Sequence, residues 1–159
     1  MSAAIDPNSF GFLITDLSRL IRAEMDRRIS EAGLGLTPGE SRTLAHAARA
    51  GVVRQNVLAE RIGIEAMTLS TYVDRLEAKG LVERVPDPDD RRAKLVRLTE
   101  AASDALGGVN SAAASIRADA SASIDPADWA TLLGLLRQAR DNLAEARAAQ
   151  SRAREETDA

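Results

Sequence analysis

Apolar residues recur at three- and four-residue steps in the first long stretch of the chain, from Ser9 to Ala32. These positions are Phe12, Leu13, Leu17, Leu20, Ile21, Met25 and Ile29. The spacing predicts an amphipathic helix, because it places the apolar side chains on one face. We expect the turn from Gly33 to Gly35 to end this helix.

The next helix has its start signal in the sequence LTPGE. Thr37 is expected to be the N-cap, with Pro38 at N1 and Glu40 at N3, which is the pattern of a capping box. This helix should run to about Ala50. The residues VVR that follow Gly51 are too few for more than a stub of strand.

Two short amphipathic helices are predicted between residues 55 and 80. Their apolar faces consist of Val57, Leu58 and Ile62 in the first helix and of Leu69, Val73 and Leu76 in the second. Gly63 is a C-cap for the first helix, and the second runs from Ala66 to Lys79 with Gly80 just past its end. Two short helices around a tight turn have the layout of a helix-turn-helix.

The runs VERV and AKLVRL then predict two strands of a hairpin, after which Thr99 is expected to cap a helix. Residues 101–123 are rich in alanine, serine and glycine, so we expect packing against a partner to hold that helix. The sequence IDPADW predicts a last helix with Asp125 as its N-cap and Pro126 at N1. The polar tail RAAQSRAREETDA should fray.

The predicted fold is therefore mainly α with a small β-hairpin. It is a winged helix-turn-helix with helical extensions on both sides. At 159 residues the chain has about the length of one domain. It has no stretch of about 18 apolar residues and no apolar leader, so the expected location is the cytoplasm, without a membrane partner.

Composition excludes some kinds of chemistry. The chain has no cysteine, which excludes disulfides and thiolate sites, and its single histidine, His46, supplies a metal site poorly. Net charge is −3, but the middle of the chain, residues 54–97, holds nine bases and eight acids. Binding of nucleic acid would therefore have to depend on where the charges lie rather than on their sum.

The loop PDPDDRR between the two predicted strands allows three interpretations: a carboxylate cluster, a solvated hairpin tip, or a basic finger for an acidic polymer. A calcium loop needs a central glycine and a distal glutamate, and the sequence has neither at the required spacing. Catalysis by two carboxylates lacks a nucleophile, phosphate loop or cofactor motif elsewhere in the chain. We therefore expect no metal, no cofactor and no enzymatic activity.

The chain resembles the MarR family of transcriptional regulators from about residue 9 to residue 147. The resemblance rests on the helix-turn-helix LAERIGIEAMTLSTYVDRLEAKGLVER (58–84) and on the wing PDPDDRRAKLVRLTE (86–100). It implies a homodimer that binds a pseudo-palindromic operator in double-stranded DNA. Residues 1–35 and 100–150 would form the dimerisation helices, residues 36–99 the DNA-binding lobe, and residues 151–159 a polar tail.

A recognition helix presents the face opposite its buried stripe to the bases of the major groove. On the second helix of the motif, the side chains of that face that could read DNA are Met67, Thr68, Ser70, Thr71 and Arg75. Arg54, Gln55 and Asn56 precede or begin the first helix, where free N–H groups favour phosphate. The alternative is that these polar residues only solvate an exposed surface.

In the family, an aspartate of the wing holds the arginine two residues later, and the matching positions here are Asp90 and Arg92. The resemblance thus implies that Arg92 enters the minor groove with Asp90 as its brace. Arg91 and Lys94 are expected to meet phosphate. Asp87 and Asp89 are expected to form the turn and to point away from the groove.

The resemblance further implies a repressor that a small anionic or aromatic effector releases. Family ligands lodge near the first, second and fifth helices, so His46 or Arg49 could contact such a ligand, although a structural histidine is the simpler interpretation. Two other functions stay open. One is a winged-helix module for protein–protein assembly without DNA binding, which the low net basicity favours slightly; the other is a small cytosolic enzyme.

Overall fold

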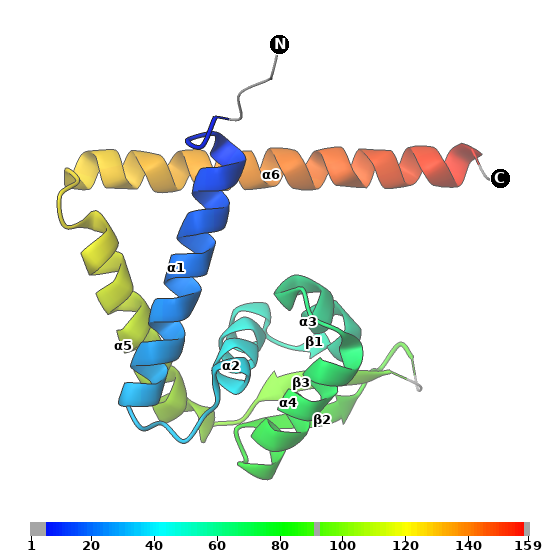
Figure 1. Cartoon of the computed structure of the whole chain (residues 1–159). Helices are drawn as coiled ribbons and strands as arrows, with labels where there is room; N and C mark the ends of the chain where they lie inside the picture. The colour runs from blue at the N-terminus through cyan, green and yellow to red at the C-terminus, as the bar shows by residue number, and fades with distance from the viewer. Residues whose placement is uncertain (1–5, 91–92, 158–159) are drawn as a thin grey trace. The chain divides into compact units, whose positions relative to one another are not determined.

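The computed structural model describes residues 6–90 and 93–157 (Figure 1). Its elements in chain order are α1 (Phe10–Glu31), α2 (Pro38–Ala50), β1 (Val53–Arg54), α3 (Gln55–Ile62), α4 (Ala66–Ala78), β2 (Val82–Pro86), β3 (Lys94–Leu98), α5 (Ala102–Ser121) and α6 (Pro126–Thr157). The predicted mainly helical fold with a winged helix-turn-helix is confirmed. One compact unit ends at Ile116, and a second begins at Arg117. No helix of the described residues is long and apolar enough to cross a membrane.

The start of α2 is the predicted capping box. The Thr37 hydroxyl accepts a hydrogen bond from the backbone N–H of Glu40 at 3.3 Å, and the Glu40 carboxylate accepts one from the backbone N–H of Thr37 at 3.0 Å. Pro38 stands at N1, where a missing N–H costs no helical bond. The backbone at Gly39 passes so close to α4 that a Cβ there would lie 2.2 Å from the Tyr72 ring.

The helix-turn-helix is built around one apolar core. Leu58 of α3 and Leu69, Val73 and Leu76 of α4 are all completely buried. Between the two helices, Gly63 adopts a φ of 74°, a left-handed conformation that glycine takes without strain. The sharp turn therefore depends on Gly63, and the packing of the two helices depends on the core side chains.

The wing is a three-stranded antiparallel sheet in the order β1-β3-β2. In β2 and β3 Val82 faces Leu98 and Pro86 faces Lys94, while the predicted stub β1 pairs with the other edge of β3, with Val53 opposite Val96. Val53, Val82 and Val96 are buried, so one face of this small sheet closes the core under α2, α3 and α4.

Helices α1 and α5 share a second, smaller core. Ile29 of α1 packs with Val109 and Ala112 of α5. Gly108 leaves room for Leu34, whose Cδ2 would lie 2.6 Å from a Cβ at that position. Packing thus holds the part of α5 in the first unit, as its alanine- and glycine-rich sequence predicted.

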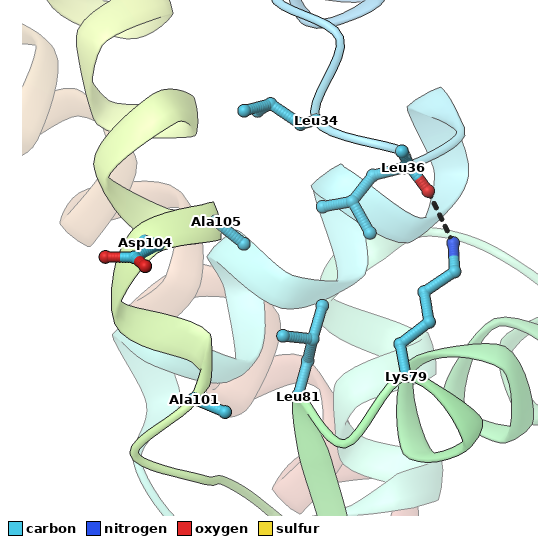
Figure 2. A pocket seen from close by; sticks show the side chains of 8 residues that line it. Leu34, Leu36, Lys79, Leu81, Ala101, Asp104 and Ala105 are labelled. Atoms are coloured by element: carbon cyan, nitrogen blue, oxygen red, sulfur yellow. Dashed lines mark hydrogen bonds between the residues drawn. The ribbon is translucent and has the colours of Figure 1, made fainter.

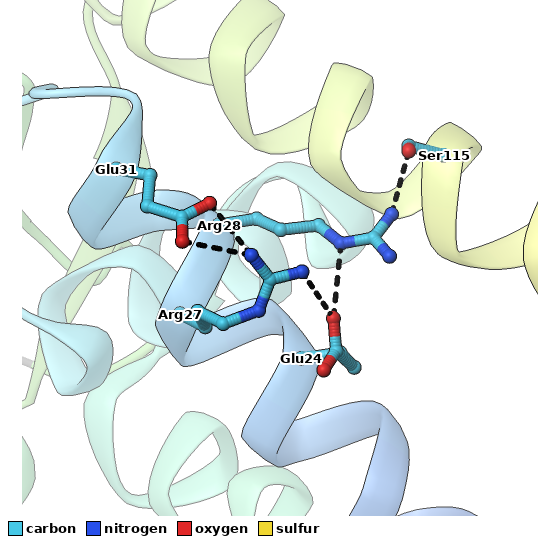
Figure 3. Close-up of polar contacts among 5 residues, drawn as sticks. All are labelled: Glu24, Arg27, Arg28, Glu31 and Ser115. Atoms are coloured by element: carbon cyan, nitrogen blue, oxygen red, sulfur yellow. Dashed lines mark hydrogen bonds and ion pairs between the residues drawn. The ribbon is translucent and has the colours of Figure 1, made fainter.

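A polar network lies beside this second core (Figure 3). Arg28 Nη1 of α1 donates a hydrogen bond to the Ser115 hydroxyl of α5 at 2.6 Å, and Arg28 Nε donates to Glu24 at 3.2 Å. Arg27 bridges Glu24 and Glu31 along α1, with an N–O distance of 2.7 Å to each. The Arg28 side chain therefore links the two helices beyond the apolar contact.

One prediction about a helix start was wrong. Thr99 does not cap α5, which begins at Ala102; instead the Thr99 hydroxyl donates to the Gly80 carbonyl oxygen at 2.5 Å. The polar tail is helical, because α6 continues to Thr157, and its fraying stays a prediction. Its alanine, arginine, glutamine and glutamate residues favour helix, and no glycine or proline follows Gly134. At the other end of α6 the Asp125 carboxylate caps as predicted, accepting from the Ala127 N–H at 2.8 Å.

A buried carboxylate links the start of α2 to the end of α4. Glu40 is only 2% exposed, and its Oε2 accepts a hydrogen bond from the Lys79 ammonium at 2.6 Å. Arg75 contributes a further positive charge, 4.0 Å away. Burial by itself would raise the pKa of Glu40, but the hydrogen bonds from Lys79 and the Thr37 N–H, with the nearby positive charges, outweigh burial and lower it.

Glu40→Gln should therefore lower the free energy of unfolding at pH 7 by about 1.5–3 kcal/mol, the range for hydrogen bonds to charged groups. A carboxyl with a lowered pKa stabilises the fold above its ordinary value of 4.5 and loses that contribution as pH falls through the folded value. The difference between wild type and variant should thus shrink below about pH 4.5. Urea unfolding at a series of pH values measures this difference in the free energy of unfolding. Glu31→Gln, at an exposed carboxylate, is the control and should change the free energy of unfolding little. An undiminished difference at low pH would contradict this role.

Candidate nucleic-acid interface

The recognition helix of the motif, α4, presents a polar surface opposite its buried stripe. Of the five residues predicted to read DNA, Ser70 is half-buried. The other four are exposed: Met67, Thr68, Thr71 and Arg75. Met67 is 85% exposed, the largest value among the exposed large apolar side chains of the described residues. An apolar side chain held out in solvent at the start of a helix is suited to contact with a methyl group, such as that of thymine.

The threonine hydroxyls of this surface are within reach of solvent. Thr71 Oγ1 donates to the Met67 carbonyl oxygen at 3.1 Å, which orients the hydroxyl along the helix and leaves its oxygen as an acceptor. The Thr68 side chain is exposed one residue before the buried Leu69. Both hydroxyls can exchange hydrogen bonds with base edges or phosphates.

Arg84 of β2 ties the wing to the recognition helix, and the sequence analysis missed it. Its Nη2 lies 2.6 Å from Asp74 Oδ1 and its Nη1 2.5 Å from Glu77 Oε2. Its Nε donates to Gln55 Oε1 at 3.2 Å, and Nη2 also donates to the Ser70 carbonyl oxygen at 3.4 Å. The Arg84 side chain is only 19% exposed. One guanidinium thereby joins β2 to α3 and α4 and forms ion pairs with two acids of α4, which offsets one of their two negative charges.

The sequence contained an indirect signal for this contact. Asp74 and Glu77 lie three residues apart on α4, where two carboxylates would repel a nucleic acid unless a cation lies beside them. Arg84 stands in the strand that follows α4, and Figure 1 shows that strand running beside the helix. The ion pairs of Arg84 with Asp74 and Glu77 show that this arginine supplies the cation.

The start of α3 brings three predicted phosphate ligands together, with different surroundings. Asn56 is exposed, whereas the Gln55 side chain accepts from Arg84. The guanidinium of Arg54 donates through Nε to Asp87 Oδ2 at 2.5 Å, and the Arg54 side chain remains 42% exposed. Arg54 is thus held by a partner that the sequence analysis did not predict.

Asp87 is buried at the base of the wing. It is 5% exposed, and its Oδ1 accepts from the backbone N–H of Asp89 at 2.9 Å. This contact confirms the predicted turn-forming role. The hydrogen bonds from the Asp89 N–H and then from Arg54 lower the pKa of Asp87, although burial opposes them. The carboxylate is therefore charged at neutral pH.

The tip of the wing is only partly described. Arg91 and Arg92, predicted to meet phosphate and the minor groove, lie outside the described residues, so the predicted pairing of Asp90 with Arg92 stays a prediction. The Ala93 N–H donates to the Asp90 carbonyl oxygen at 2.9 Å. Lys94 is exposed at the start of β3, as a phosphate ligand requires.

The predicted effector ligands, His46 and Arg49, lie on α2 and do not border the cavity that Leu34, Lys79 and Asp104 help to line in the first unit. His46 is half-buried, and its pKa is lowered by burial and then by the charges of Arg49 and Arg42. His46 is therefore neutral at pH 7, and a neutral imidazole attracts an anion weakly.

That cavity, of about 500 Å³, lies between the α1–α2 connection, the end of α4 and the start of α5 (Figure 2). Its lining is mostly apolar, with one cation and one acid: Leu34, Gly35, Leu36, Lys79, Leu81, Ala101, Asp104 and Ala105. The Lys79 ammonium donates to the Gly35 carbonyl oxygen at 2.7 Å at its edge. The lining thus combines apolar walls with one ammonium, which is bonded to Gly35 and Glu40, and one carboxylate.

Comparison with known proteins agrees with this geometry. A model of the MarR family matches residues 34–93. The transcriptional regulator PA3341 is 37% identical, with 86% of this chain and 99% of that chain covered and a TM-score of 0.72. Escherichia coli MarR in its apo form, 23% identical, shares the fold with a TM-score of 0.71 over 85% of this chain and 98% of that chain. The PcaV regulator of Streptomyces coelicolor, in complex with its natural ligand, is 25% identical, with coverages of 87% and 97% and a TM-score of 0.64.

The Arg84 contacts predict a large difference between two arginines of one sheet. Arg84→Gln should lower the free energy of unfolding by about 1–3 kcal/mol, because it removes several charge-assisted hydrogen bonds from a mostly buried side chain. Arg97→Gln removes only the exposed pair of Arg97 with Glu83, and should cost less than about 1 kcal/mol. Chemical unfolding of the two variants measures the difference, and equal losses would show that Arg84 is not a structural link.

Proposed function

The chain belongs to the MarR family of DNA-binding transcriptional regulators, and on that premise we propose that it acts as a dimeric repressor released by a small-molecule effector. The observation that carries the proposal is the polar, exposed face of α4 opposite a fully buried stripe. A recognition helix needs this division, because it must be fixed to its own domain while it offers side chains to the major groove. The wing beside it supplies a second contact.

The proposed DNA contacts divide by the kind of group. Met67, Thr68, Ser70 and Thr71 would read base edges, and Arg75, one turn further on, a phosphate or a guanine. Arg92, braced by Asp90, would enter the minor groove. The remaining residues would meet phosphates: Arg54, Gln55, Asn56, Arg91 and Lys94.

The proposed homodimer is supported by the apolar surface of α1. Its large side chains are between 37% and 57% exposed: Phe10, Phe12, Leu13, Ile14, Leu17, Leu20 and Ile21. All of them except Phe12 fall on one side of the helix at about 100° per residue, and an exposed apolar stripe of this kind marks an interaction surface. A second copy of the chain fits this surface, because a dimer places two recognition helices in successive major grooves about 34 Å apart and so matches a pseudo-palindromic operator.

The proposed effector is a small anionic or aromatic molecule. The cavity beside Lys79 supports this proposal more directly than His46 or Arg49 does, because it combines apolar walls with a cation. An anionic ligand there would compete with Glu40 for the Lys79 ammonium at the end of α4. PcaV, which has the same fold, binds its own natural ligand. A ligand that favours another orientation of α4 would change the spacing of the two recognition helices and weaken operator binding.

Binding to the promoter DNA that flanks its own gene tests the function. We expect a shifted complex whose affinity falls steeply with salt, by about 10³-fold or more between 50 and 200 mM if the dimer neutralises six or more phosphates. Fluorescence anisotropy at several salt concentrations measures the slope, with a scrambled duplex as control. The same titration in the presence of a panel of aromatic acids tests whether an effector releases the protein from the DNA. Absence of binding at low salt, or affinity that does not depend on salt, would contradict DNA binding as the function.

Leu17→Asp tests the dimer. Leu17 is 48% exposed, so the change should leave the protomer folded but place a charge in the apolar contact between two copies. Light scattering should show a monomer, and operator affinity should fall more than about tenfold, since each half-site is then bound alone. Thr15→Asp, on the polar side of α1, is the matched control and should stay dimeric. A dimeric Leu17→Asp protein would exclude this face as the interface.

A further inference from the structure

Two residues 33 positions apart, Arg54 and Asp87, meet at the base of the wing. Arg54 ends β1 and immediately precedes α3, and Asp87 directly follows β2. In the strand order β1-β3-β2 these two strands are not neighbours, because β3 lies between them. Strands in a sheet are about 4.8 Å apart, so the contact has to cross about two strand spacings, a distance that suits the long arginine side chain.

The Asp87 carboxylate is engaged on both of its oxygens. Oδ2 accepts from Arg54 Nε, and Oδ1 accepts from the Asp89 N–H. The Asp87 backbone N–H donates to the Ala93 carbonyl oxygen at 3.3 Å, on the returning side of the loop. A charge that is 95% buried is tolerated only with such partners. The three contacts fix the point at which the wing loop leaves the sheet.

We propose that Arg54 and Asp87 form a positioning pair that sets the wing loop for DNA before DNA arrives, an inference that rests on the proposed function. Arg54 then acts mainly through Asp87, and this role replaces the phosphate contact proposed for it above. Because Arg54 also precedes α3, the pair connects the wing loop to the helix-turn-helix at a second point, separate from the contacts of Arg84 with Asp74 and Glu77.

The positioning pair and the alternative, a simple phosphate contact by Arg54, predict opposite changes in operator affinity for one substitution. If Arg54 only binds phosphate, Asp87→Asn removes a negative charge near a polyanion and releases Arg54, so operator affinity should rise. If the pair positions the wing, Asp87→Asn should weaken operator binding although it makes the protein less acidic. Asp89→Asn is the matched control: it removes the same charge from an exposed neighbour, and it should not weaken binding.

The experiment measures operator affinity and its salt dependence for the full-length wild type and for Arg54→Gln, Asp87→Asn, Asp89→Asn and the double variant Arg54→Gln/Asp87→Asn. We expect Arg54→Gln and Asp87→Asn each to weaken binding about fivefold or more, the effect of one lost charge-assisted hydrogen bond. The double variant should bind the operator no less tightly than the single variant with the lower affinity, because both substitutions break the same contact. Thermal unfolding checks that each variant is folded at the temperature of the binding assay.

Unchanged or tighter binding by Asp87→Asn would overturn the proposal. So would a loss in Arg54→Gln that comes with a salt slope lower by about 0.9, since that identifies a phosphate contact. Hydrogen exchange without DNA separates this inference from the proposed function. Faster exchange at the Asp87 and Asp89 amides in Arg54→Gln supports the pair even if no operator is found, and unchanged exchange overturns it.

Discussion

The complete burial of one face of α4 is the constraint on which the rest of the structure depends. Leu69, Val73 and Leu76 have no exposed surface, so the rotation of this helix about its axis is fixed. A shift by one residue would turn the helix by about 100° and bury Thr68 or Ser70 in place of Leu69. The core contributed by α2, α3 and the sheet therefore decides which side chains α4 shows to solvent.

Arginine contacts connect this fixed helix to the wing. Arg84 reaches from β2 to α3 and α4, and Arg54 reaches from the start of α3 to the end of β2. The Arg84 guanidinium engages acceptors on α3 and α4 at once, and the Arg54 guanidinium engages an acceptor 33 positions later in the chain. A planar group with five donors can do this with defined geometry, whereas a lysine offers one compact charge. The helix-turn-helix and the wing are thereby held as one body for a partner that contacts both.

Local signals were enough to predict the elements but not the contacts between them. The capping box at Thr37, the turn at Gly63 and the cap at Asp125 depend on residues within a few positions, and all three were predicted correctly. The pair of Arg54 with Asp87 depends on the strand order β1-β3-β2, which no local pattern contains. Thr99 was misassigned for the same reason: a hydroxyl at a predicted helix start took a tertiary partner, Gly80, instead.

Three acids of the helix-turn-helix and the wing hold arginine side chains in place. Asp74 and Glu77 together anchor Arg84, and Asp87 anchors Arg54. The net charge of the chain consequently says little about where its exposed positive charges lie. A basic residue in place of Asp74 would raise the net charge and would still remove an acceptor that keeps β2 beside α4.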